Sequence, residues 1–123
     1  MTNAQTAFEP EHIQLEQVNS LVSAAGVEGA RAILEAFQRS TTDLLASLSE
    51  RVHGGALDDA SRDAHAVKGS AANVGAHLLS ESAALIEQAC KAGDAAAAAM
   101  ALADARSLFD HFCVHFEAYL ARH

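Results

Sequence analysis

The segment from residue 63 to residue 76 places a histidine, a lysine and a glycine close together on one predicted helix. Lys68 follows His65 by three residues and Gly69 follows it by four, and side chains at these spacings lie on one helix face. Neutral imidazole is a nucleophile near pH 7, and a lysine ammonium binds phosphate as a point charge. These residue types therefore favour acceptance of an anionic group at His65.

Gly69 is an unexpected residue in the interior of a helix. Glycine there costs about 1 kcal/mol relative to alanine, although the chain uses alanine at 29 of its 123 positions. The missing methyl group suggests that a partner approaches closely. We interpret four neighbours of His65, mostly small, as the partner surface: Ser61, Arg62, Ala72 and Ala76. The alternative is a solvated surface histidine beside an incidental glycine.

The composition predicts that an all-α fold positions this segment. Alanine is the strongest helix former, and the only proline is Pro10. No run of residues alternates between apolar and polar, which argues against strands. A chain of 123 residues has the size of one domain. We expect residues 1–9 to form a flexible tail and residues 10–123 to form a single domain.

Glycine positions and apolar spacing divide the chain into five helices. A short amphipathic helix follows Pro10 and ends at Gly26, and four longer helices cover residues 28–53, a segment that starts near 56, 76–92 and 94–121. Short connections force neighbouring helices to be antiparallel. We predict an up-down-up-down four-helix bundle with the short additional N-terminal helix over one end. The main expected core residues are Leu34, Phe37, Leu44, Leu48, Ala64, Val67, Leu79, Leu85, Ile86, Phe109, Phe112 and Phe116.

The charge of the chain excludes several classes of partner. Sixteen acidic and eight basic residues give a net charge of −8, which argues against binding to nucleic acid or to an anionic membrane surface. No apolar stretch has the length of a membrane span, and no signal-peptide pattern is present. Cys90 and Cys113 fall in apolar helical pattern, as buried thiols of a reducing compartment do. We therefore expect a cytoplasmic protein.

A metal site is the alternative use of the histidines. His111 and His115 are spaced i, i+4 and could share a metal ion, but the Glu-x-x-His pairs of a di-iron bundle are missing. We expect these two histidines to flank the phenylalanine stripe on its polar side, and we predict no metal site.

The run from His65 to Ser70, followed by Gly75 and Ala76, resembles the signature of histidine-containing phosphotransfer (HPt) domains. That signature is H-x-x-K-G-S/A-S/A, followed after a few residues by G-A. Residues 30–53 and the segment from Leu85 to Asp94 are also similar to helices of that family. The sequence departs from many members at Ala71, where they carry a second serine.

The resemblance implies a phosphocarrier in a two-component phosphorelay. His65 would accept a phosphoryl group from the aspartate of one receiver domain and pass it to the aspartate of another. The resemblance implies that Lys68 neutralises the phosphoryl charge and that Gly69 leaves space for the receiver. Ser70 and Gln38 are candidates for orienting the imidazole by a hydrogen bond.

The implied partners are the receiver domains of a hybrid sensor kinase and of a response regulator. The Mg²⁺ for transfer would belong to the receiver, and the chain would need no cofactor of its own. No nucleotide-binding signature is present, so we expect no autokinase activity. We expect a monomer, because the face around His65 must stay open. The alternatives are an adaptor that binds or sequesters receiver domains without carrying phosphate, and a phosphoacceptor module excised from a chemotaxis-type kinase.

Overall fold

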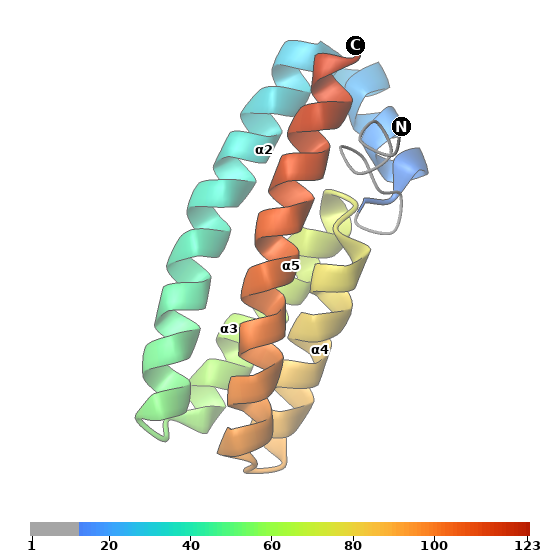
Figure 1. The fold of residues 1–123 in the computed structure, drawn as a ribbon. Coiled ribbons are helices and arrows are strands. Elements are labelled where there is room, and N and C mark those ends of the chain that lie inside the picture. The colour runs from blue at the N-terminus through green and yellow to red at the C-terminus, as the bar shows by residue number, and fades with distance from the viewer. Residues whose placement is uncertain (1–12) are drawn as a thin grey trace.

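The computed structural model describes residues 13–123, and this part of the chain is an antiparallel bundle of helices (Figure 1). The helices are α2 (Leu15–His53), α3 (Leu57–Asn73), α4 (His77–Lys91) and α5 (Ala95–Ala121). The described residues contain no strand, which confirms the all-α prediction. The expected flexible tail, residues 1–9, and the predicted helix start at Pro10 lie outside the described range.

α2 contains two helical arms that meet at Gly26. This glycine has φ 77° and ψ 173°, which are not helical values, so the chain bends there. The arm before Gly26 corresponds to the predicted short helix, and the longer arm corresponds to the helix predicted over residues 28–53. Figure 1 shows the short arm beside the turn between α3 and α4 at one end of the bundle, as predicted.

The turn between α3 and α4 holds the short arm in place. The backbone N–H of Gln14 donates a hydrogen bond to the carbonyl of Gly75 at 2.7 Å, and Nε2 of Gln17 donates to the carbonyl of Asn73 at 2.9 Å. Gly75 has φ 86°, and a Cβ atom there would lie 3.2 Å from both the Gln14 carbonyl and the Gln17 side chain. Only glycine allows both the turn and this close approach.

The core lies along the bundle axis and is centred on phenylalanine rings. Phe37 of α2 packs edge-on against Phe109 and Phe112 of α5, with ring centroids 5.8 and 5.5 Å apart. Phe112 packs in the same way against Phe116. These edge-to-face contacts add to the free energy gained from burying the rings. The phenylalanine stripe therefore belongs to the core, as the spacing predicted.

Two placements relative to the core were wrong and a third was only partly right, because the buried positions repeat with a different spacing from the assumed one. Leu45, four residues after Thr41, is buried in the core, and the predicted Leu44 is partly buried against it. Leu85 is 57% exposed, because the buried positions of α4 are spaced as 79, 83, 86 and 90. His115 is buried among the core positions of α5, whereas it was expected on the polar side.

None of the helices in residues 13–123 combines the length and hydropathy that a transmembrane segment requires.

Candidate functional site

His65 lies in the middle of α3 and points out of the bundle. Ala64 and Val67 on either side are fully buried, so they fix which face of α3 meets the core. A residue directly after Ala64 is rotated by about 100° from that face. The His65 side chain is accordingly 67% exposed. The predicted orientation of His65 toward solvent is therefore confirmed.

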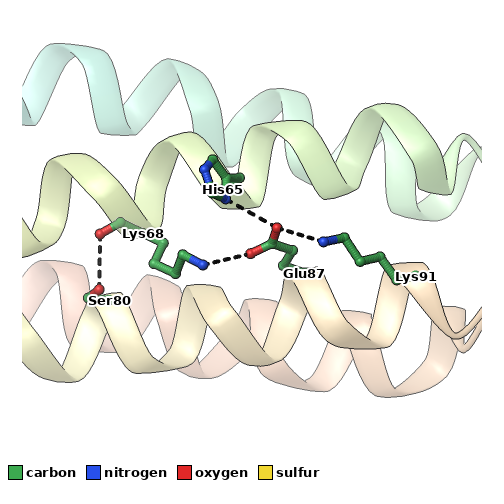
Figure 2. Close-up of polar contacts among 5 residues, drawn as sticks. All are labelled: His65, Lys68, Ser80, Glu87 and Lys91. Atoms are coloured by element: carbon green, nitrogen blue, oxygen red, sulfur yellow. Dashed lines mark hydrogen bonds and ion pairs between the residues drawn. The ribbon is translucent and has the colours of Figure 1, made fainter.

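One carboxylate from the neighbouring helix lies beside the imidazole. Glu87 of α4 is only 11% exposed at its side chain, and its Oε2 is 3.2 Å from Nδ1 of His65 (Figure 2). Lys68 of α3 donates to Oε1 at 3.1 Å, and Lys91 of α4 donates to Oε2 at 3.1 Å. The carboxylate of Glu87 therefore contacts three side chains, two from α3 and one from α4.

The protonation state of Glu87 follows from these contacts. The hydrogen bond from Lys68, opposed by the cost of burial and supported by the bond from Lys91, lowers the pKa of Glu87 from 4.5 to about 2. Glu87 is thus ionised at neutral pH, and an ionised carboxylate only accepts hydrogen bonds. It follows that Nδ1 of His65 must be the donor in the contact with Oε2.

This assignment fixes the tautomer of the imidazole. A neutral histidine that carries its proton on Nδ1 has its lone pair on Nε2. Because the ring is mostly exposed, Nε2 is accessible to a partner molecule. The site therefore presents a nucleophilic nitrogen whose orientation and tautomer are set by a buried anion.

Glu87 is the functional residue to which we assigned no role from the sequence. The available signal was its position on the apolar face of α4, directly after Ile86 and three residues before Cys90. A buried acid on such a face needs cationic or hydrogen-bonding partners. Lys91 at i+4 and the lysine beside His65 supply them. The sequence alone did not show that α4 packs against the His65 side of α3.

Lys68 is near His65, as its spacing predicted, but it contacts the imidazole through Glu87. Its side chain is 37% exposed. The backbone carbonyl of Lys68 also accepts a hydrogen bond from Oγ of Ser80 at 2.9 Å (Figure 2). This contact joins α3 to α4 one turn after His65 and helps to fix the register of the two helices at the site.

The surface of α3 around His65 is open at Gly69. Beyond its chain neighbours and the backbone of its own helix, a Cβ atom added to Gly69 would have no heavy atom within 4 Å, so no internal contact requires glycine here. Ala72 and Arg62 are exposed on the same side. We call Arg62, His65, Gly69 and Ala72 the His65 face.

Two residues expected in the partner surface are not part of this exposed face. Ala76 is buried, because α3 ends at Asn73 and the helical spacing from His65 does not continue through the turn. Ser61 is also buried, and it is one of the residues that line a depression next to His65. The partner-surface prediction was therefore wrong for Ala76 and, as an exposed residue, for Ser61.

The two candidates for orienting the imidazole form other contacts. Oγ of Ser70 donates to the carbonyl of Ala66 at 3.1 Å within its own helix. Gln38 lies on α2 and hydrogen-bonds the Cys113 side chain of α5. The hydrogen bond that orients the imidazole in this structure is the one that Nδ1 of His65 donates to Glu87.

A depression of about 390 Å³ lies beside His65, between α3 and α4. It is lined by Asp58, Ser61, Arg62, His65, Glu87 and Lys91. Within residues 13–123, no group of three or more His, Cys, Asp or Glu side chains could hold a metal ion.

Comparisons with known proteins identify the family of this chain. The family model of the Hpt domain matches residues 32–122. A crystal structure of a rice protein, assigned to the histidine-containing phosphotransfer proteins, superposes with a TM-score of 0.84 at 20% sequence identity. The alignment covers 97% of this chain and 90% of the rice chain. A search of curated proteins found no match. Since the family model spans most of the sequence, including the helices that carry His65 and Glu87, this chain belongs to the Hpt domain family.

Proposed function

We propose that this Hpt domain carries phosphoryl groups between receiver-domain aspartates through a phosphohistidine at Nε2 of His65. The observation that carries the proposal is the hydrogen bond from Nδ1 of His65 to the ionised, buried Glu87. That bond leaves an exposed lone pair on Nε2, which is what nucleophilic attack on phosphorus requires.

The transfer step needs no proton movement. The Nε2 lone pair attacks the phosphorus of an aspartyl phosphate, the Nε2–P bond forms, and the P–O bond to the aspartate breaks and releases a carboxylate. The proton on Nδ1 stays in place, so the phosphorylated ring becomes positively charged beside Glu87. In the onward step the carboxylate of a second receiver attacks phosphorus, and the imidazole leaves as the same neutral tautomer. Glu87 therefore supports both directions of transfer.

Lys68 is the predicted counterion of the phosphoryl group. Its ammonium group is held at 3.1 Å from Oε1 of Glu87, one helical turn from His65. A lysine in this place supplies positive charge to phosphoryl oxygens without fixing them in a rigid geometry. We propose that Gly69 keeps the surface flat where the receiver lies against α3, because no packing contact inside the protein requires a glycine at this position.

Hpt domains interact with receiver domains, and we propose those of a hybrid sensor kinase and of a response regulator as the partners. The Mg²⁺ that assists transfer would be bound by the receiver. We propose that the chain works as a monomer in the cytoplasm, where its free thiols Cys90 and Cys113 stay reduced. We also propose that it does not phosphorylate itself, because the sequence lacks a glycine-rich phosphate loop.

The test is transfer of label from receiver domains phosphorylated with acetyl [³²P]phosphate. We expect acid-labile label on the wild-type chain and none on His65→Gln, with unchanged helicity by circular dichroism. His53→Gln is the matched control, because His53 is an exposed histidine whose Nδ1 contacts only its own helix, and it should be labelled like the wild type. Label that persists on His65→Gln would overturn the proposal, and receiver binding without any label would favour the adaptor function.

A further inference from the structure

Both lysines of the chain contact the same carboxylate. The sequence contains only two lysines, and its other six basic residues are arginines. Lys68 comes from α3 and Lys91 from α4, and each ammonium group lies 3.1 Å from an oxygen of Glu87 (Figure 2). The two lysines differ in exposure, because Lys91 is 66% exposed and Lys68 is 37% exposed.

The two lysines also contact different oxygens of Glu87. Lys68 contacts Oε1, whereas Lys91 shares Oε2 with Nδ1 of His65. The ammonium nitrogen of Lys91 is therefore separated from Nδ1 by no more than the sum of two hydrogen-bond distances. Lys91 also lines the depression beside His65, where Lys68 does not. A mobile, mostly exposed ammonium group thus lies next to the imidazole.

We propose that Lys91 is a second phosphoryl-binding residue, which moves from Oε2 of Glu87 to the phosphoryl group once Nε2 of His65 is phosphorylated. The inference rests on the proposed function. A phosphoryl group adds a charge near −2 with three acceptor oxygens, whereas Glu87 offers one charge already shared by three donors. Lysine has a flexible stem, so rotation of its side chain is sufficient for the exchange.

The exchange also affects the imidazole. When Lys91 leaves, the only remaining hydrogen bond to Oε2 is the one from Nδ1 of His65. By this stage the phosphorylated ring is positively charged. The hydrogen bond between Nδ1 and Glu87 then becomes a bond between two ions, which is stronger than its neutral counterpart. Arg62 is less suited to this role, because it is paired with Asp59 of its own helix at 3.1 Å and is 80% exposed.

The experiment measures the equilibrium between phosphorylated receiver and phosphorylated Hpt domain for Lys91→Ala, Lys91→Arg and Arg39→Ala. Arg39 is an exposed cation of α2 outside the site, so its removal changes the net charge equally. We expect Lys91→Ala to shift the equilibrium toward the receiver about threefold to tenfold, as loss of a partly exposed charge contact predicts. Lys91→Arg, which keeps the positive charge, should lie close to the wild-type equilibrium, and Arg39→Ala should behave like the wild type.

A second readout separates Lys91 from Glu87. In unphosphorylated Lys91→Ala, ¹⁵N NMR should still show the His65 proton on Nδ1, because Glu87 remains its acceptor. A wild-type equilibrium for Lys91→Ala, an equal shift for Arg39→Ala, or an equal shift for Lys91→Arg would overturn the inference. These outcomes leave the proposed function intact, since that function fails only when His65→Gln is labelled or the wild type is not.

Discussion

Glu87 provides His65 with a fixed hydrogen-bond acceptor, which an isolated surface histidine lacks. Its Oε2 accepts a hydrogen bond from Nδ1 at an N···O distance of 3.2 Å, and its carboxylate holds two lysines close to the ring. It stays ionised because those lysines lower its pKa to about 2. A histidine without such an acceptor interconverts between two tautomers and rotates in solvent. The reactivity of the site therefore depends on a side chain that does not itself contact the phosphoryl group.

The first prediction concerns this positioning role. Glu87→Ala removes the acceptor for Nδ1, so we expect single-turnover transfer from a phosphorylated receiver to slow by about 10- to 100-fold, as for other residues that orient a reacting histidine. Glu87→Gln keeps a carbonyl oxygen as acceptor and should slow transfer less. The ¹⁵N shifts of His65 should report mixed tautomers in Glu87→Ala only. Equal transfer rates for the wild type and Glu87→Ala would refute the role.

The sequence predicted the residues whose chemistry is visible in one helix. His65, Lys68 and Gly69 were identified because their spacing along α3 is short, and α3 forms over them as expected. Glu87 was not, because its role depends on the packing of α4 against α3, 22 residues away along the chain. Ser70 and Gln38, which the sequence offered as orienting residues, make other contacts in the structure, since hydrogen-bond partners are decided by tertiary packing.

At the scale of secondary-structure elements, α3 and α4 form the site together. α3 supplies the imidazole and one lysine, and α4 supplies the carboxylate and the other lysine. Ser80 of α4 donates to the Lys68 carbonyl and so fixes the two helices relative to each other. The glycine turn at Gly75 between them brings them together and admits the N-terminal arm.

Gly69 gives a prediction at this scale, because replacing a glycine in a helix interior should stabilise the helix while changing the docking surface. No atom outside its own stretch of helix lies within 4 Å of the Cβ position, so Gly69→Ala should stabilise the free protein by about 0.5–1 kcal/mol, measured by urea denaturation. Gly69→Leu should also fold, yet both variants should slow transfer to and from receivers, leucine more than alanine. If Gly69→Leu transfers as fast as the wild type, the open surface of α3 has no role in docking.

The sequence predicted the presence of each helix more easily than the residue at which the helix ends. The turns at glycine were visible in the sequence, as was the start of the last helix at residue 94. There the side chain of Asp94 caps the helix by accepting from the N–H of Ala97 at 3.0 Å. Ala76 was misplaced because helical spacing was extended beyond Asn73, where α3 ends. Leu85 was placed in the core by its residue type, although the repeat of α4 leaves it outside.

At the scale of the whole molecule, charge is unevenly distributed. The chain carries a net charge of −8, yet three of its eight basic residues, Arg62, Lys68 and Lys91, surround His65. This local positive charge suits an incoming phosphoryl group, although the chain as a whole is acidic. Composition alone shows the acidic net charge, but it does not show that three basic residues gather around His65.

The dependence of stability on pH follows from the lowered pKa of Glu87. Between pH 4.5 and about 2 the unfolded chain binds a proton at this residue that the folded chain does not, so stability rises with pH in this range. The contribution of Glu87 is present above pH 4.5 and is lost as the pH falls toward 2. Urea denaturation should therefore show the wild type losing stability relative to Glu87→Gln over this range. A constant difference between the two proteins would contradict the ionised pairing.

NMR of the phosphorylated chain with ¹⁵N-labelled histidines is the most direct measurement of the central claim. The structure predicts that phosphorus is bonded to Nε2 of His65, seen as ³¹P–¹⁵N coupling at that nitrogen, while Nδ1 keeps its proton beside Glu87. Coupling at Nδ1, or phosphorus on any other residue, would contradict the site built by His65 and Glu87.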